Sequence, residues 1–257
     1  MLKNKDHHRS LSENIKLGGL TAFSAGMVNV TSVVIFFSFT SNVTGHYAIL
    51  AQEISKGNWY QAAIVFLWIF LFFIGNFISN LLVITFEDSR KYLGHALPML
   101  LEIICLLGVG LYLEFHYNET LKETELLVAT MLLAMGLQNG LTASISNSSV
   151  KTTHLTGLTT DLGILFSMFT KSENRANKDL VGKAYLLLAI MLSYMTGGVF
   201  AGYTFLSVET HVLYIVCIVL AMIIVYDFSV IKLNAQKTKY FDKVTRIFIN
   251  EEKRKSA

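Results

Sequence analysis

The sequence predicts an all-α integral membrane protein, with six transmembrane helices arranged as two inverted three-helix repeats that contain broken or re-entrant segments. Three observations support this fold class: an apolar composition, the placement of the few charges, and motifs that recur in order. Of the 257 residues, 53% are hydrophobic and only 15% are charged, whereas soluble domains carry about 25% charged residues. Six spans of about 20 residues leave no room for a soluble catalytic domain.

Apolar runs between polar breaks predict the six spans. Their approximate bounds are 17–39, 60–86, 96–113, 126–147, 184–206 and 211–231. The first helix is expected to begin before its span, because Ser10 and Glu13 have the spacing of a capping box. The single proline, Pro98, is expected in the first turn of the third span, where its missing N–H costs little.

Lysine and arginine residues predict the orientation of the chain. If the N-terminus is cytoplasmic, the cytoplasmic segments hold 19 of the 21 basic residues and the external loops hold 2. This asymmetry follows the positive-inside rule and places both termini in the cytoplasm. The chain is therefore divided into a basic N-terminus (1–16), a transmembrane domain (17–231) and a basic cytoplasmic tail (232–257).

The tail carries an amphipathic pattern. Its large apolar residues fall on one helical face, and its basic residues fall mostly on the other. These apolar residues are Tyr240, Phe241, Val244, Ile247 and Phe248. The pattern predicts an interfacial helix that contacts anionic lipid headgroups. A disordered basic tail that only sets the orientation is the alternative.

Two motifs of the first half recur in the second half. The pair Gly26-x-x-Asn29 matches Gly136-x-x-Asn139 at an offset of 110 residues. The segment from Thr40 to Gly45 matches the segment from Thr152 to Gly157 at an offset of 112, with the pattern T-x-x-x-T-G in both. Weaker matches relate Gly75 to Gly197 and the Glu102–Cys105 segment to the Tyr214–Cys217 segment.

These matches predict a duplication, with repeat one at about 17–113 and repeat two at about 126–231. Because each repeat contains three spans, the second must insert upside down relative to the first. Inverted repeats recur in secondary transporters, whose substrate sites lie near the bilayer midplane between the repeats.

Short apolar stretches follow each T-G motif, at 46–55 and 158–169. Helices of this length reach only about half of a bilayer. We predict broken or re-entrant helices, with Thr44 and Thr156 as N-caps and with the glycines allowing close backbone approach. The alternative is that threonine and glycine cap ordinary loops at the headgroup level.

The candidate substrate site combines polar residues of both repeats across a central cavity, because non-helical backbone at membrane depth must be buried or line a wet cavity. Helix N-termini and uncharged polar side chains favour a small polar or anionic solute. The candidate proton-coupling groups are His154, Asp161 and Glu102. The substrate-site residues are Asn29, Thr40, Asn42, Thr44, Gly45, His46, Gln138, Asn139, Thr152, His154, Thr156, Gly157 and Asp161.

Each of these residues also has a purely structural interpretation. Asn29, Gln138 and Asn139 suit hydrogen bonds between helices, and the histidines suit satisfied polar groups near an interface. The small-residue pairs Gly75 with Ser79 and Gly198 with Gly202 favour close helix packing rather than a pathway.

No motif of an enzyme, a metal site or a phosphate-binding loop is present in the sequence. We therefore expect no catalytic residues, no cofactor, no metal and no nucleic-acid partner. Cys105 and Cys217 lie in apolar runs and indicate neither a disulfide nor a metal site.

The leading hypothesis is a small secondary transporter or permease whose partners are the lipid bilayer and a small-molecule solute. The alternative is a non-transporting membrane module that binds a lipid or a partner protein, and an intramembrane enzyme ranks third. A homo-oligomer is left open.

The motifs also resemble a known family. The stretch from Ala25 to Asn29 followed by Asn42-Val-Thr44-Gly45-His46, and the stretch from Ala134 to Asn139 followed by Thr152-Thr-His-Leu-Thr156-Gly157, resemble the YoaK family of bacterial inner-membrane proteins. The resemblance covers about residues 15–232. It implies a six-helix membrane protein in the inner membrane of a bacterium, and it implies no particular substrate.

Overall fold

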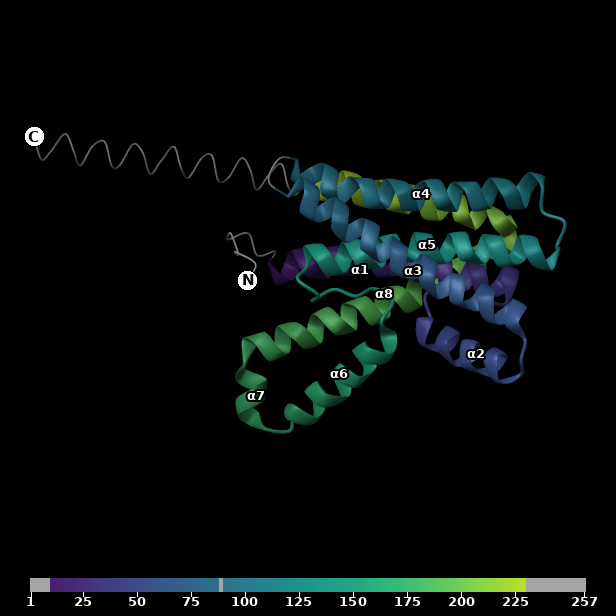
Figure 1. Cartoon of the computed structure of the whole chain (residues 1–257). Coiled ribbons are helices and arrows are strands. Elements are labelled where there is room, and N and C mark those ends of the chain that lie inside the picture. Colours follow the sequence, from purple (N-terminus) through teal and green to yellow (C-terminus); the bar gives the residue numbers. More distant parts are fainter. Residues whose placement is uncertain (1–9, 88–89, 230–257) are drawn as a thin grey trace, which may run out of the picture.

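The computed structural model describes residues 10–87 and 90–229, and within these ranges the chain is helical and contains no strand (Figure 1). The predicted amphipathic tail lies outside the described residues and stays a prediction. The elements are α1 (Leu11–Phe36), α2 (Val43–Ser55), α3 (Trp59–Phe86), α4 (Lys91–Phe115), α5 (Leu121–Ile145), α6 (Leu155–Met168), α7 (Ser172–Ala176), α8 (Lys178–Val208), the 3-10 turn η1 (Glu209–His211) and a last helix over 212–229.

Five segments are long and apolar enough to cross a membrane, namely α1, α3, Tyr92–Phe115 of α4, α5 and Lys178–Ser229. The last segment is 52 residues long. It is divided at η1, where Glu209 has a φ of 48° and the chain reverses direction. The prediction of an all-α, multi-pass membrane protein is therefore confirmed.

Two helix starts show how local sequence sets the boundaries. α1 begins at Leu11, because Ser10 and Glu13 form the predicted capping box, with the Ser10 N–H donating to Glu13 Oε2 at 2.8 Å. α4 begins at Lys91, earlier than predicted, because the polar residues before Ala96 hide the start of the helix. Pro98 therefore lies inside α4 and not in its first turn. At this interior position the proline ring removes one helical hydrogen bond.

α1 packs mainly against α8 through glycines that bring the two backbones together. A Cβ on Gly26 would lie 2.1 Å from the carbonyl oxygen of Tyr194. A Cβ on Gly197 would lie 2.0 Å from the carbonyl oxygen of Phe23. No larger residue fits at either position without separating the helices, which is the small-residue packing common in membrane bundles.

α3 packs against α5 in the same manner. A Cβ on Gly136 would lie 2.3 Å from the carbonyl oxygen of Phe72, and a Cβ on Gly75 would lie 2.4 Å from that of Leu133. The expectation that these small residues serve helix packing is thus met at Gly75, and Ser79 adds a hydrogen bond to the Leu137 carbonyl.

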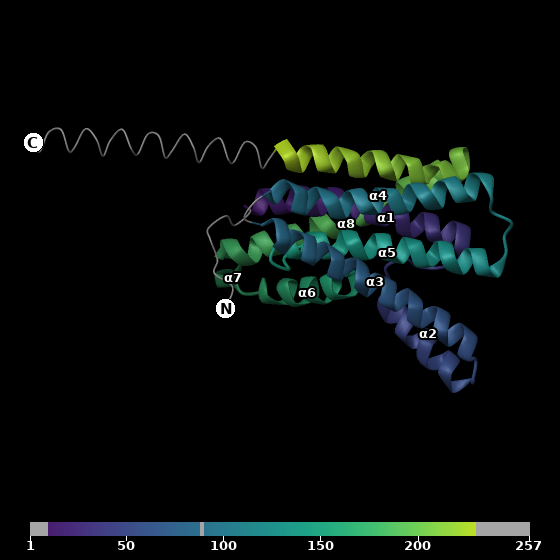
Figure 2. The ribbon, with the colours of Figure 1, turned by 45° about the horizontal axis from the view of Figure 1, so that its top comes forward.

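α4 and the helix over 212–229 pack beside this core (Figure 2). His95 Nδ1 lies 2.7 Å from Asp227 Oδ2, and both side chains are buried. Glu102 lies in the middle of α4, whereas Tyr214 lies near the start of the last helix. The sequence match between the Glu102 and Tyr214 segments therefore joins positions that are not equivalent in the two helices.

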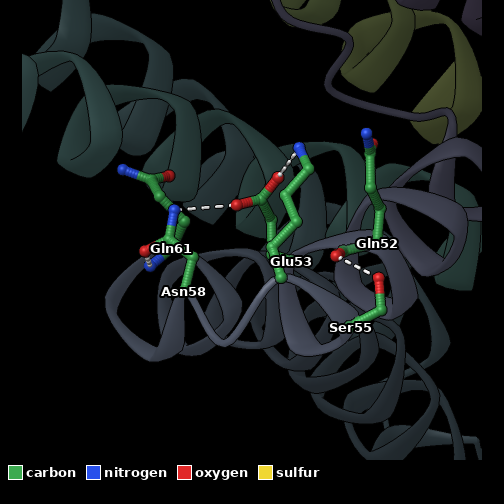
Figure 3. A network of polar contacts seen from close by, with 6 residues as sticks. Gln52, Glu53, Ser55, Asn58 and Gln61 are labelled. Atoms are coloured by element: carbon green, nitrogen blue, oxygen red, sulfur yellow. Dashed lines mark hydrogen bonds and ion pairs between the residues drawn. The ribbon is translucent and has the colours of Figure 1, made fainter.

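The turn between α2 and α3 is polar (Figure 3). The Glu53 carboxylate accepts hydrogen bonds from Lys56 Nζ at 3.0 Å and from Asn58 Nδ2 at 2.8 Å. The bond from Lys56, and then that from Asn58, holds the pKa of Glu53 below its ordinary value. A charged, exposed turn of this kind indicates that the C-terminal end of α2 reaches water.

Candidate functional site

The connection between α1 and α2 doubles back along α1. Phe37 ends α1 in the left-handed region, with a φ of 53°. Three residues farther on, the N–H and Oγ1 of Thr40 donate to Asn29 Oδ1 at 2.9 and 3.1 Å. Asn29 lies about 10 Å before the end of α1 at 1.5 Å per residue. α2 therefore begins near the middle of the bundle and runs outward, beside the start of α3 (Figure 1).

Asn29 and Thr40 are buried and satisfy each other. The remaining amide of Asn29 donates to the hydroxyl of Tyr194 on α8. These contacts fit the interpretation of Asn29 as a residue that joins helices.

The start of α2 differs from the prediction in one respect. Its N-cap is Asn42, whose Oδ1 accepts from the Gly45 N–H at 3.1 Å, and Thr44 lies exposed within the first turn. A Cβ on Gly45 would lie 2.7 Å from Asn42 Nδ2, so the glycine admits a capping side chain and not a second backbone. The predicted cap at Thr44 is wrong, because the helix starts before it.

His46, on α2, is buried and contacts both the α1–α2 connection and α3. One ring nitrogen, Nε2, lies 2.9 Å from the Phe39 carbonyl oxygen. The ring packs edge-on against Trp68 of α3, with 5.5 Å between the ring centroids. Its Nδ1 has no hydrogen-bond partner among the described residues.

The connection between α5 and α6 doubles back in the same way but more loosely. Thr153 Oγ1 donates to Asn139 Oδ1 at 3.3 Å, and Asn139 Nδ2 lies 3.5 Å from Asn76 Oδ1 on α3. Thr152, the sequence equivalent of Thr40, is fully buried, and its hydroxyl has no partner within the part of the chain that the structure describes.

α6 also begins before its predicted cap. Its N-cap is His154, which makes no side-chain capping bond, and Thr156 is exposed in the first turn. A Cβ on Gly157 would lie 2.2 Å from His154 Cδ2, so the imidazole lies over the glycine as the Asn42 side chain does in α2. The helix N–H groups are capped by a side chain in α2 but not in α6.

Two predicted residues lie apart from these segments. Gln138 joins α5 to α1, with its Nε2 donating to the Thr21 carbonyl at 2.6 Å and to Ser24 Oγ at 2.7 Å. Glu102 is fully buried in α4, and neither carboxylate oxygen has a hydrogen-bond partner among residues 10–87 and 90–229.

A cavity of about 650 Å³ lies beside the first turns of α6. Three predicted residues line it, namely His154, Gly157 and Asp161, and Asp161 Oδ2 lies 3.0 Å from Lys183 Nζ. The predicted residues of the first repeat do not line it. The complete lining is Leu11, Asn14, Asn147, Ser148, Ser149, Lys151, His154, Gly157, Leu158, Asp161, Lys183, Leu186 and Leu187.

The sequence did not predict the two lysines of this cavity. Lys151 and Lys183 contributed only to the count of basic residues on the cytoplasmic side. Lys151 stands directly before the second T-x-x-x-T-G motif, and this proximity is the one signal that could have found it. Within the described ranges, no group of three or more His, Cys, Asp or Glu side chains could hold a metal ion.

A family model described as "Protein of unknown function (DUF1275)" matches residues 17–226. The chain belongs to the DUF1275 family. This family corresponds to the YoaK-like membrane proteins, so the resemblance seen in the sequence is confirmed. The DUF1275 match extends from α1 into the last helix and includes α2, α6 and most of the cavity lining. Comparison with curated proteins and with solved structures gave no match.

Proposed function

We propose that this protein is a small secondary transporter or permease for a small polar or anionic solute, built from two inverted three-helix repeats in the inner membrane of a bacterium. The observation that carries the proposal is the cavity of about 650 Å³ at the start of α6. Its volume falls within the range of about 300–1,000 Å³ that small-molecule sites occupy. Its charged lining is unusual for a membrane domain, where ionisable groups mark solute or proton pathways.

The packing supports the inverted repeat. The two closest glycine contacts of the α1–α8 pair, those of Gly26 and Gly197, have counterparts in the α3–α5 pair at the same sequence offsets. Gly26 and Phe23 precede Gly136 and Leu133 by 110 residues, whereas Phe72 and Gly75 precede Tyr194 and Gly197 by 122. The corresponding helices also run in opposite directions, α1 against α5 and α3 against α8 (Figure 2).

The short helices support the re-entrant segments of this proposal. α2 has 13 residues and α6 has 14, which gives each a length of about 20 Å, too short to cross a bilayer. Each follows a connection that returns toward the middle of the preceding long helix, and the two run toward opposite ends of the bundle (Figure 1). Their N-termini would then lie near the bilayer midplane, as in discontinuous transporter helices.

The proposed access is from one side. The cavity is lined by the beginning of α1 and by the first half of α8, which the basic residues assign to the cytoplasm together with both termini. The structure would then correspond to an inward-open state. In this proposal His154 and Asp161 couple transport to protons, because both line the cavity, whereas Glu102 does not.

Uptake of small metabolites by the purified protein in liposomes tests the function. We expect accumulation of at least one polar or anionic solute, and loss of that uptake in the Asp161→Asn variant at matched protein content. If no solute accumulates while the vesicles retain folded protein, the non-transporting module that binds a lipid or a partner protein replaces this proposal.

The basic tail is proposed to hold anionic lipid headgroups. Each basic residue near an anionic surface contributes about 1 kcal/mol. A peptide spanning 235–257 should become helical on anionic vesicles and much less so on neutral ones, as measured by circular dichroism. A coil on both surfaces would leave the tail as an orientation signal alone.

A further inference from the structure

We propose that the cavity beside α6 recognises an anionic oxygen group, a carboxylate or a phosphate, through Lys183 and Lys151, and that Asp161 is the internal counter-ion which the ligand displaces. This inference rests on the proposed function insofar as the anion is a transported solute. The site itself requires only that the cavity binds an anion, whether or not the protein transports it.

The charges of the cavity favour an anion. Two lysines and one aspartate line it, so it carries a net positive charge even with His154 neutral. The first turn of α6 adds to this potential, because the N-terminus of a helix presents backbone N–H groups and a positive dipole end. His154 and Gly157 place that turn in the cavity wall, and His154 does not cap it.

The ion pair between α6 and α8 is exposed enough for a ligand to replace one of its partners. Lys183 Nζ and Asp161 Oδ2 are 3.0 Å apart, but the two side chains are 53% and 44% exposed. Exposed ion pairs contribute little stability, so an entering anion can replace the Asp161 carboxylate on Lys183 at small cost. Lys183 would then make a charge-assisted hydrogen bond to the ligand.

The first repeat differs from the second at the places that correspond to this site. Its half-helix α2 is capped by Asn42, and its connection is held by Asn29 and Thr40. At the places equivalent to Lys183 and Asp161, 122 and 112 residues earlier, the first repeat has Gln61 and Ile49. The repeats are therefore alike in backbone and different in charge, which assigns anion recognition to the second.

Protection of a cysteine from alkylation tests the site. The full chain carries Ser149→Cys, which lies exposed in the cavity lining, together with Cys105→Ala and Cys217→Ala. The rate of maleimide labelling is measured in detergent with succinate or inorganic phosphate, at constant ionic strength set with sodium chloride, and choline serves as the cation probe. We expect succinate or phosphate to slow labelling and choline to have no effect.

Two variants should shift the apparent affinity in opposite directions. Lys183→Gln should weaken protection about tenfold, because a charge-assisted bond is lost. Asp161→Asn should strengthen it about threefold, because the competing carboxylate is removed. A merely structural ion pair would make both variants behave alike. The matched control is Lys122→Gln, an exposed lysine on α5 outside the cavity lining, which should leave protection unchanged.

The same assay in lipid nanodiscs distinguishes a lipid headgroup from a soluble anion as the ligand. Protection in phosphatidylglycerol nanodiscs but not in phosphatidylcholine nanodiscs would identify a lipid headgroup as the ligand, whereas protection by succinate or phosphate in detergent identifies a soluble anion. Either result supports the site. Labelling that is insensitive to every anion, or slowed by choline, overturns it. Retained protection without liposome uptake would remove the transport proposal and leave this site standing.

Discussion

Tyr60 of α3 donates a hydrogen bond of 2.7 Å to Glu125 of α5, and these two residues, 65 positions apart in sequence, join the N-terminal ends of the two helices. Gln61 Nε2 donates to the other carboxylate oxygen at 2.9 Å, and Trp68 Nε1 donates to the Glu125 carbonyl at 3.0 Å. Glu125 is buried. Near the start of α8, Lys183 lines a cavity instead. The bundle is therefore held closed at one end and is hollow at the other.

Replacing Glu125 should loosen the closed end. Glu125→Gln keeps the shape of the side chain but removes the charge that two donors share, so we expect a loss of about 1–2 kcal/mol in unfolding free energy. Thermal unfolding in detergent measures this loss. Glu119→Gln is the matched control, because Glu119 is exposed in the loop before α5 and surface changes usually stay within about 0.5 kcal/mol. Equal effects of the two variants would show that the Glu125 contacts contribute nothing.

Valine at Gly26 or Gly136 should disrupt the fold. The nearest atoms to the added Cβ are backbone carbonyl oxygens at 2.1 and 2.3 Å, which cannot turn aside as a side chain can. Overpacking typically costs about 1–3 kcal/mol, and separating two helices should exceed this range. Gly108→Val on α4 is the control, since nothing lies within 4 Å of its Cβ position. The yield of monodisperse protein after detergent extraction measures the outcome, and equal yields would contradict the packing argument.

Valine at Gly157 should impair function more than stability. The added Cβ meets only the His154 ring, at 2.2 Å, and this ring can swing away and leave its place in the cavity wall. We expect a melting temperature close to that of the parent and at least about a tenfold loss of solute uptake, as steps that depend on positioning are sensitive to small displacements. Gly163→Val serves as control on the same helix, because its Cβ position is open. Uptake that survives in both variants would remove His154 from the site.

Cysteine labelling tests the orientation. In a chain without Cys105 and Cys217, single cysteines at positions 5 and 245 should resist an impermeant thiol reagent added to intact cells, whereas one at position 119 should react. The basic residues drive this expectation, since 19 of 21 fall on the proposed cytoplasmic side. External labelling at position 5, or protection at 119, would reverse the assignment of the cavity to the cytoplasm.

The long helices could be predicted from the sequence, because an apolar run of membrane length has few alternatives. The start of α1 followed from Ser10 and Glu13, which form a local motif. The caps of α2 and α6 could not be predicted as well. Threonine and asparagine are both good N-caps, and α2 begins after the earlier of the two, Asn42.

The tertiary contacts of the site could not be predicted from the sequence. Lys183 and Asp161 lie on different helices and meet only because α6 packs against α8. Glu125 lies just before the predicted span at 126–147. The packing of α3 on α5 shows that it accepts hydrogen bonds from Tyr60 and Gln61. Contacts of this kind depend on which helices pair, and a single sequence does not specify the pairing.

The pairing of α1 with α8 sets an order on biosynthesis. Roughly 170 residues separate the end of α1 from the end of its main partner, which at about 5–20 residues per second amounts to about 10–30 s of translation. Over that interval the backbone of α8 that Gly26 contacts, at Tyr194 and Gly198, is not yet made. α3 and α5 emerge much closer together and can associate while the nascent chain still grows. A ribosome stalled before α8 would therefore leave an assembled α3–α5 pair and an α1 that lacks its main packing partner.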